Sequence, residues 1–239
     1  MLPYIVVIPA RYKSSRFPGK PLIDLKGKSM VQRTYEQCLK AFPKDRIFVA
    51  TEDQRIVNHC KELEMNVILT SDDCLTGTDR IAEVAHKIDA EYYINVQGDE
   101  PLFNPKDLSQ LLASIEDNNG EIINGFCPIT SEEDFISLSI PKVVFRPNGR
   151  LLYMSRSPIP GNKLKNFNFG YRQVCAYAFP KKALLKFSSL KQKTPLEQEE
   201  DIEILRFLEI GFEVTMIPMS SESISIDHPE DVVKVCEKL

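Results

Sequence analysis

The chain has 239 residues, of which 43 % are hydrophobic, and its 30 Lys+Arg against 34 Asp+Glu give a net charge of −4. A high apolar fraction with a modest net charge is typical of a folded globular protein and argues against disorder. The acidic pI of about 5.6 argues against a nucleic-acid-binding surface. No apolar run approaches the roughly 18 residues that cross a membrane, and the N-terminus lacks the basic region of a signal peptide.

The six cysteines are scattered, none of them forms a CxxC pair, and the three histidines are isolated from one another. This usage predicts reduced thiols and a cytoplasmic location, and it does not predict a zinc site.

Short apolar runs alternate with helical patterns through the first half of the chain. We expect strands at 4–9, 46–51, 66–70 and 92–97, and helices that begin at Ser29, Asp53, Thr78 and Asn104. Ser29 with Gln32 three residues later predicts a capping box, and the apolar spacing of the second helix predicts that Leu63 faces inward. The alternation is typical of βαβ units and a mostly parallel sheet.

The second half has a different pattern. Two short strands, 142–146 and 150–154, flank the turn sequence Pro147-Asn148-Gly149. A strand at 173–179, one long amphipathic helix at 195–209, a strand at 213–217 and a helix at 229–238 follow. We therefore expect a single α/β domain over 1–239, with an antiparallel insertion at approximately 141–180.

A loop rich in basic residues follows the first strand. Residues 10–28 hold six basic residues and one acid, a net charge of +5, whereas the rest of the chain carries −9. Open α/β sheets bind ligands at the carboxyl ends of their strands, and such a cluster of cations suits a triphosphate. The loop lacks both the GxxxxGK[ST] spacing of a P-loop and the GxGxxG of a dinucleotide-binding fold, which argues against a dehydrogenase.

Two acids are expected near this loop. Asp99 follows the strand at 92–97, and Asp227 lies between a short apolar run and the last helix. Two carboxylates facing a triphosphate favour Mg²⁺, which binds through one or two acids plus phosphate oxygens. Asp99 could instead be a turn residue, and Asp227 a helix N-cap.

Five motifs, in order along the chain, carry a family resemblance. They are PARYKSSRFPGKPL at 9–22, TGTDRIAE at 76–83, VQGDEP at 96–101, SRSPIP at 155–160 and IDHPED at 226–231. Together they resemble the sugar-acid cytidylyltransferases, most closely those that activate 3-deoxy-manno-octulosonate (Kdo). The resemblance implies a Rossmann-like fold of the nucleotide-diphospho-sugar transferase type. It also implies transfer of CMP from CTP to the anomeric hydroxyl of a 2-keto sugar acid, with release of pyrophosphate, for lipopolysaccharide or capsule synthesis.

The resemblance also assigns roles to residues. The catalytic set it implies is Lys20, Asp99 and Asp227, with Asp99 and Asp227 as magnesium ligands. The implied nucleotide-binding residues are Arg11, Lys13, Arg16, Lys20, Gly77, Thr78, Arg80 and Gln97. The implied sugar-binding residues are Arg156, Gln173, Tyr177 and Glu203. The partners expected are CTP and a small acidic sugar, and the protein is expected to be a homodimer. The insertion at approximately 141–180 is expected to serve the acceptor side of the site and dimerisation.

Two positions depart from the family pattern. Gln173 stands where the family usually has histidine, and Ile204 where it usually has glutamine. Lost hydrogen-bond partners change acceptor discrimination, so Kdo is the first expectation and another sugar acid or polar acceptor is the alternative. A non-catalytic nucleotide-binding module is a third interpretation, which the presence of Lys20, Asp99 and Asp227 disfavours. The apolar residues of 141–160 could form a dimer surface, but core packing explains them equally well.

Overall fold

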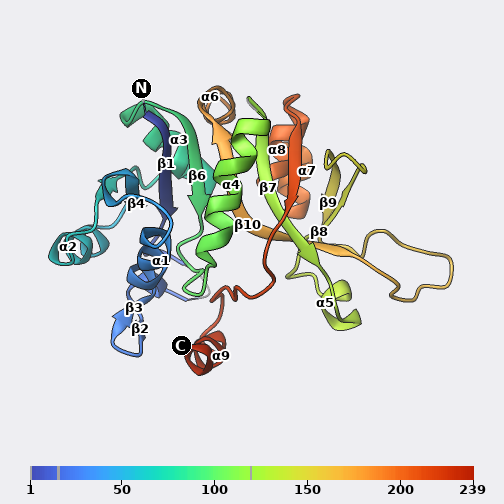
Figure 1. Cartoon of the computed structure of the whole chain (residues 1–239), viewed down its shortest axis with the longest axis horizontal. Helices are drawn as coiled ribbons and strands as arrows, with labels where there is room; N and C mark the ends of the chain where they lie inside the picture. Colours follow the sequence, from blue (N-terminus) through green and yellow to red (C-terminus); the bar gives the residue numbers. More distant parts are fainter. Residues whose placement is uncertain (1, 15–16, 119) are drawn as a thin grey trace.

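The protein folds around one twisted sheet with helices on both faces (Figure 1), as a computed structural model shows for residues 2–14, 17–118 and 120–239. The main path of the sheet runs β11-β7-β10-β6-β1-β4-β5. These strands are β1 Leu2–Pro9, β4 Ile47–Thr51, β5 Val67–Leu69, β6 Ala90–Val96, β7 Ile122–Pro128, β10 Tyr171–Pro180 and β11 Val214–Pro218.

Along this main path, four of the six strand pairs are parallel. The central strand β1 is parallel to both β4 and β6, β4 is parallel to β5, and β7 is parallel to β11. Strand β10 is antiparallel to both of its neighbours, β6 and β7. The mostly parallel α/β sheet predicted from the sequence is confirmed.

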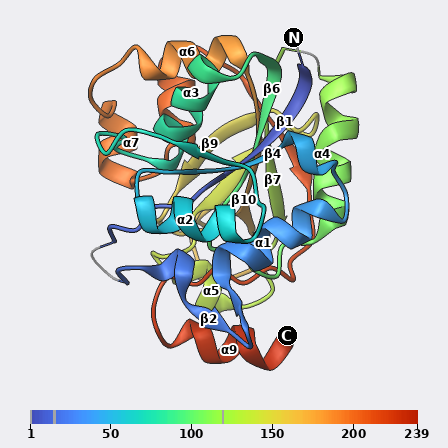
Figure 2. The same ribbon diagram turned by 90° about the vertical axis from the view of Figure 1, so that its left-hand side faces the viewer.

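Strand β1 is buried on both faces, which explains its continuous apolar run. Val6 and Ile8 pack in the core layer beneath the helices α1 (Met30–Leu39) and α4 (Pro105–Asp117). Ile5 and Val7 belong to the core layer on the other face, where α3 (Gly77–Lys87) and α6 (Lys181–Ser188) lie (Figure 2). The larger helices are α1 Met30–Leu39, α2 Gln54–Glu62, α3 Gly77–Lys87, α4 Pro105–Asp117, α6 Lys181–Ser188 and α9 Asp231–Lys238.

Three of the helices begin at the capping residues predicted from the sequence, although two predicted details differ. The side chains of Ser29, Asp53 and Asn104 accept hydrogen bonds from main-chain N–H groups of the helices that they precede. The capping box predicted at Ser29 is incomplete, because the Gln32 side chain donates to Glu36 instead. Leu63 lies past the end of α2 and is partly exposed, so its predicted inward orientation is wrong.

The long helix predicted at 195–209 is wrong, because the structure has two short helices there. Helix α7 (Pro195–Glu200) ends at Asp201, whose φ of 51° is left-handed, and α8 (Ile204–Glu209) starts three residues later. Across the break, Arg206 of α8 forms a bidentate ion pair with Glu197 of α7. Residues nine apart lie on opposite faces of a straight α-helix, so this ion pair requires the break.

Several elements were not predicted. Strand β7 was missed because Asn124 and Gly125 interrupt its apolar run, although Asn124 is buried and donates to the main-chain oxygens of Val174 and Ala176 in β10. Other unpredicted elements are α5 Glu132–Ile136, α6 and the two-residue strands β2 Asp24–Leu25 and β3 Lys28–Ser29.

The predicted hairpin around Pro147-Asn148-Gly149 is present. It consists of β8 (Lys142–Phe145) and β9 (Leu151–Ser155), and β8 extends the sheet by pairing with β10. Among the apolar residues considered for a dimer surface, Val143 and Leu151 are buried in the core, while Leu152 is exposed. Core packing therefore accounts for Val143 and Leu151.

Candidate active site

Two adjoining cavities open at the carboxyl ends of β1 and β6. The first, of about 230 Å³, lies between the basic loop after β1, the turn after β6 and the start of α3. The second, of about 280 Å³, lies between that turn, β10 and the segment after β11. The residues that line both cavities are Gln97, Asp99, Asp201, Glu203 and Asp227. Two ligands, one in each cavity, would both contact these five polar side chains.

Lys20 connects the basic loop to the two acids predicted to bind metal. Its Nζ lies 2.7 Å from Asp99 Oδ2 and 3.6 Å from Asp227 Oδ1, and it also donates to the main-chain oxygen of Ile226 at 2.6 Å. The Lys20 side chain is largely buried. The structure therefore brings together all three residues of the predicted catalytic set.

The main chain holds these residues in place. Ile226 N donates to Asp99 O, which joins the last segment of the chain to the turn after β6. Helix α9 packs beside the β2–β3 hairpin (Figure 1), where Val235 and Ile226 bury Leu25 and Met30. This small apolar cluster fixes the basic loop against the segment that carries Asp227.

Gly98 allows the ends of β1 and β6 to approach closely. A Cβ atom at this position would lie 2.6 Å from the main-chain oxygen of Pro9. That separation is far inside van der Waals contact, and neither partner is a movable side chain. A glycine is therefore required between Gln97 and Asp99.

Glu203 occupies the N-terminus of α3. Its two carboxylate oxygens accept hydrogen bonds from Gly77 N at 3.2 Å and from Thr78 N at 2.8 Å. Burial raises the pKa of Glu203, and the hydrogen bonds to Thr78 oppose that shift. The predicted nucleotide-binding amides of Gly77 and Thr78 thus have an intramolecular acceptor, and Glu203 lies at the junction of the cavities.

The predicted nucleotide-binding side chains fall into two groups. Arg11, Lys20, Arg80 and Gln97 line the first cavity. Arg80 is almost fully buried and pairs with Glu52 at 3.0 Å. Lys13, in contrast, is exposed, pairs with Asp72 and lines an open surface hollow that shares Arg11 with the first cavity. Arg16 lies outside the described residues.

The predicted sugar-binding residues Arg156, Gln173, Tyr177 and Glu203 all line the second cavity. Arg156 donates from its guanidinium to the main-chain oxygens of Glu200, Leu138 and Asp201. Gln173 donates to the Asn124 side chain at 3.0 Å. Burial raises the pKa of Tyr177 well above its usual value, so its hydroxyl stays protonated.

Ile204, the second departure from the family pattern, has a different location. It is buried in the core with Phe207, on the inner side of α8. Its side chain contributes to packing, whereas Gln173 faces the second cavity.

Glu100 was not predicted as a site residue. It lines the second cavity, accepts a hydrogen bond from Ser223 Oγ, and is almost fully buried. Burial, with the neighbouring Asp99 carboxylate adding to it, raises the Glu100 pKa to about 7. The VQGDEP motif contains Glu100, but nothing in the motif indicates that the Glu100 side chain is buried.

The described residues contain no cluster of three or more His, Cys, Asp and Glu side chains that could hold a metal by itself. Asp99 and Asp227, which lie beside Lys20, offer only two carboxylates. No helix within the described part of the chain is long and apolar enough to cross a membrane.

The sheet, the basic loop at its carboxyl edge and the paired cavities fit a nucleotidyltransferase. The sequence model of the cytidylyltransferase family matches residues 5–224. The chain is 39 % identical over 243 residues to 3-deoxy-manno-octulosonate cytidylyltransferase of Protochlamydia amoebophila, covering 98 % of this chain and 93 % of the relative. It is 42 % identical over 245 residues to the protein of that name from Geobacter metallireducens, covering 98 % and 96 %.

A solved structure agrees with these relatives. CMP:2-keto-3-deoxy-manno-octonic acid synthetase, complexed with CTP, superposes with a TM-score of 0.91 at 35 % identity, covering 99 % of this chain and 98 % of the other. The chain therefore belongs to the cytidylyltransferase family, in the group of the 3-deoxy-manno-octulosonate cytidylyltransferases, as its motifs predicted.

Proposed function

We propose that this protein transfers CMP from CTP to the anomeric hydroxyl of Kdo and releases pyrophosphate. The observation that carries the proposal is the position of Lys20, Asp99 and Asp227 at the junction of two polar cavities. A reaction that joins two anionic substrates needs one compartment for each substrate and a charged boundary between them. The names of the relatives supply the identities of the two substrates.

The nucleotide is assigned to the first cavity. Arg11 and Lys20 provide cations for the triphosphate, and Gln97 provides an amide for the base or ribose. Glu203 accepts the N–H groups at the start of α3, so the usual phosphate position at a helix N-terminus is taken by a side chain. The triphosphate is therefore directed toward the basic loop.

The acids fit a magnesium ion. Asp99 and Asp227 offer only carboxylate oxygens, which are the ligands that Mg²⁺ prefers, and the triphosphate supplies further oxygens. Both acids are already within 4 Å of one cation, Lys20 Nζ, so their charge is directed at a common point. When bound, the ion would polarise phosphate oxygens and lower the pKa of the attacking hydroxyl.

The protein's own groups supply positioning and charge. Lys20 neutralises negative charge at the boundary where the α-phosphate and the acceptor hydroxyl meet, and phosphoryl-type transfer depends mainly on such positioning. No side chain is required as a nucleophile. The acceptor hydroxyl forms the new bond to the α-phosphorus, and pyrophosphate leaves.

The acceptor is assigned to the second cavity. Arg156 and Arg172 provide positive charge for a sugar carboxylate, and Gln173 and Tyr177 provide hydrogen-bonding groups for hydroxyls. Ile204 lies in the core, so its departure from the family pattern affects packing. Only Gln173 remains as a difference inside the cavity, which favours Kdo over the alternative of another acceptor.

Pyrophosphate release tests this proposal. The purified protein is assayed with Mg²⁺, each of the four nucleoside triphosphates, and a panel of sugar acids that includes Kdo. We expect release with CTP and Kdo, and a CMP-sugar as the second product. Release with CTP and another acid but not with Kdo would support the alternative acceptor. No pyrophosphate release with any acceptor in the panel would favour the non-catalytic interpretation.

The requirement for magnesium, the homodimer, the cytoplasmic location, the single domain over 1–239 and the acceptor-side role of 141–180 stay predictions. Replacing Mg²⁺ by EDTA in the same assay tests the first of them directly. The expected result is loss of turnover that added Mg²⁺ restores.

A further inference from the structure

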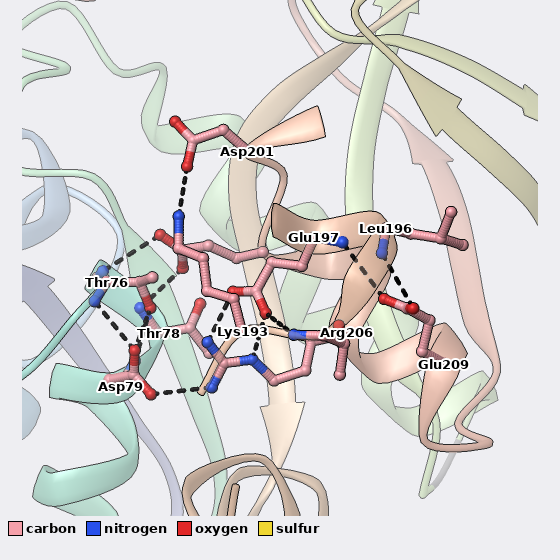
Figure 3. Close-up of polar contacts among 12 residues, drawn as sticks. Thr76, Thr78, Asp79, Lys193, Leu196, Glu197, Asp201, Arg206 and Glu209 are labelled. Carbon is pink, nitrogen blue, oxygen red and sulfur yellow. Dashed lines mark hydrogen bonds and ion pairs between the residues drawn. The ribbon is translucent and has the colours of Figure 1, made fainter. Parts of the chain in front are cut away.

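Lys193 brings a cation to the first cavity from a part of the chain far from the basic loop. It lies just before α7 and lines the cavity, and only 22 % of its side chain is exposed. Its Nζ lies 2.5 Å from Asp201 Oδ1 (Figure 3). No sequence motif singled out either residue.

Asp201 lies between two cations that face different cavities. Lys193 approaches its carboxylate from the first cavity, and Arg156 Nη2, from the second, lies 3.9 Å from the other carboxylate oxygen. Arg156 also donates to the main-chain oxygen of Asp201 at 3.0 Å. The left-handed backbone at Asp201, where α7 ends, places this residue on the wall shared by both cavities.

The ion pair has the character of an exchangeable contact. The Asp201 side chain is 70 % exposed, and water competes effectively for such a carboxylate. A triphosphate carries several negative charges, so it competes for a lysine better than one exposed carboxylate does. Lys193 can therefore change partner without leaving a buried charge unpaired.

We propose that Lys193 is a further nucleotide-binding residue, and that it exchanges Asp201 for an oxygen of the phosphate chain when the nucleotide binds. The inference rests on the proposed function for the identity of the nucleotide. The exchange predicts opposite effects on nucleotide affinity for the loss of Lys193 and for the loss of the Asp201 charge. Loss of Lys193 removes an attractive contact, whereas loss of the Asp201 charge removes a competitor and a repulsive group.

The test is a calorimetric titration of the full-length protein with CTP. Lys193→Met is compared with Lys191→Met, because Lys191 lies two residues away in the same segment and is exposed. We expect Lys193→Met to weaken CTP binding about 5- to 20-fold, as for a partly exposed charged hydrogen bond. Lys191→Met is expected to bind CTP as the unaltered protein does.

Asp201→Asn is expected to change CTP affinity in the opposite direction. Asparagine tolerates a left-handed backbone, so this variant keeps the chain break. We expect it to bind CTP about 2- to 5-fold more tightly. The binding constant of Lys193→Met is also expected to depend less steeply on NaCl concentration than that of the unaltered protein, because one phosphate contact is lost.

Unchanged CTP binding in Lys193→Met would overturn the inference. Weaker binding in Asp201→Asn would overturn the exchange, because it would mean that Asp201 holds Lys193 in place for the nucleotide. Absence of CTP binding by the unaltered protein would instead contradict the proposed function. In that case the same variants are titrated with whichever nucleoside triphosphate does bind, and a loss confined to Lys193→Met would still support the inference.

Discussion

Lys20 Nζ lies 2.7 Å from Asp99 Oδ2, and this contact joins two segments that are 79 residues apart in the chain. One segment is the basic loop after β1 and the other is the turn after β6. Their strands are neighbours in the sheet and run parallel, so their carboxyl ends meet at one edge. The ion pair places a cation and a metal-binding type of acid at the boundary of two cavities.

Substitution of Lys20 tests whether its positive charge contributes to turnover. Lys20→Met keeps most of the aliphatic stem but removes the charge beside Asp99 and Asp227. We expect kcat for pyrophosphate release to fall by about 100-fold or more, since loss of one charge-stabilising donor commonly costs that much. Steady-state kinetics measure it. The control is Lys28→Met, which loses an exposed ion pair to Glu36 and should retain full activity.

Glu100 makes stability depend on pH. Its pKa is raised from 4.5 to about 7, so the folded protein holds this proton more tightly than the unfolded chain does. Stability from this group is complete below about pH 4.5 and is lost as the pH rises through 7. The free energy of unfolding should therefore fall by up to about 3 kcal/mol across that range.

Urea unfolding in metal-free buffer at several pH values between 5 and 8 measures this effect. Glu100→Gln cannot ionise, so its stability should exceed that of the unaltered protein increasingly as the pH rises. Parallel pH curves for the two proteins would show that Glu100 is not the group responsible.

Arg206 stabilises the break between α7 and α8. Its guanidinium is fully buried, binds both oxygens of Glu197 at 2.5 and 2.7 Å, and reaches Asp79 at 3.1 Å (Figure 3). Arg206→Met leaves the buried Glu197 carboxylate without its cation. We expect a loss of about 3–5 kcal/mol in the free energy of unfolding.

A double-mutant cycle with Glu197→Gln measures the coupling. The double variant Arg206→Met/Glu197→Gln should be more stable than Arg206→Met alone, because it no longer buries an uncompensated charge. Strictly additive effects in denaturant unfolding would contradict this account of the pair.

Substitution of Gly98 tests whether the close approach of β1 and β6 is needed for stability and turnover. The added methyl group of Gly98→Ala would meet the Pro9 carbonyl oxygen and push the two strand ends apart. We expect a loss of roughly 1–3 kcal/mol in stability, the usual range for overpacking, together with reduced turnover. At Gly161 a Cβ meets nothing within 4 Å, so Gly161→Ala is the matched control and should change neither quantity.

Part of the candidate site could be predicted from the sequence. Strand patterns placed the basic loop and Asp99 after strands of a mostly parallel sheet, whose carboxyl ends lie at one edge whatever their separation in the chain. The structure accordingly joins Lys20, in the basic loop, to Asp99. The choice of Lys20 among the six basic residues of the loop came from the family resemblance, because the charge pattern alone does not distinguish between them.

The sequence was not sufficient where tertiary contacts override local preference. The segment 195–209 has a helical pattern throughout, yet the buried pair between Glu197 and Arg206 breaks it at Asp201. That break presents Glu203 to the start of α3 and Asp201 to Lys193. Lys13 pairs with Asp72 on the surface, a contact that the charge pattern of the loop could not show, and its role as a phosphate ligand stays a prediction.

The most direct test of the account compares the unaltered protein with Asp99→Ala in the presence of CTP, Kdo and Mg²⁺. We expect pyrophosphate release by the unaltered protein and turnover reduced at least about 1,000-fold in the variant. The circular dichroism spectrum and the unfolding midpoint of the variant should stay close to those of the unaltered protein. The exposed acid Asp117, changed to alanine, is the control and should leave the rate unaltered. Undiminished pyrophosphate release by folded Asp99→Ala would remove Asp99 from the reaction and contradict the proposed mechanism.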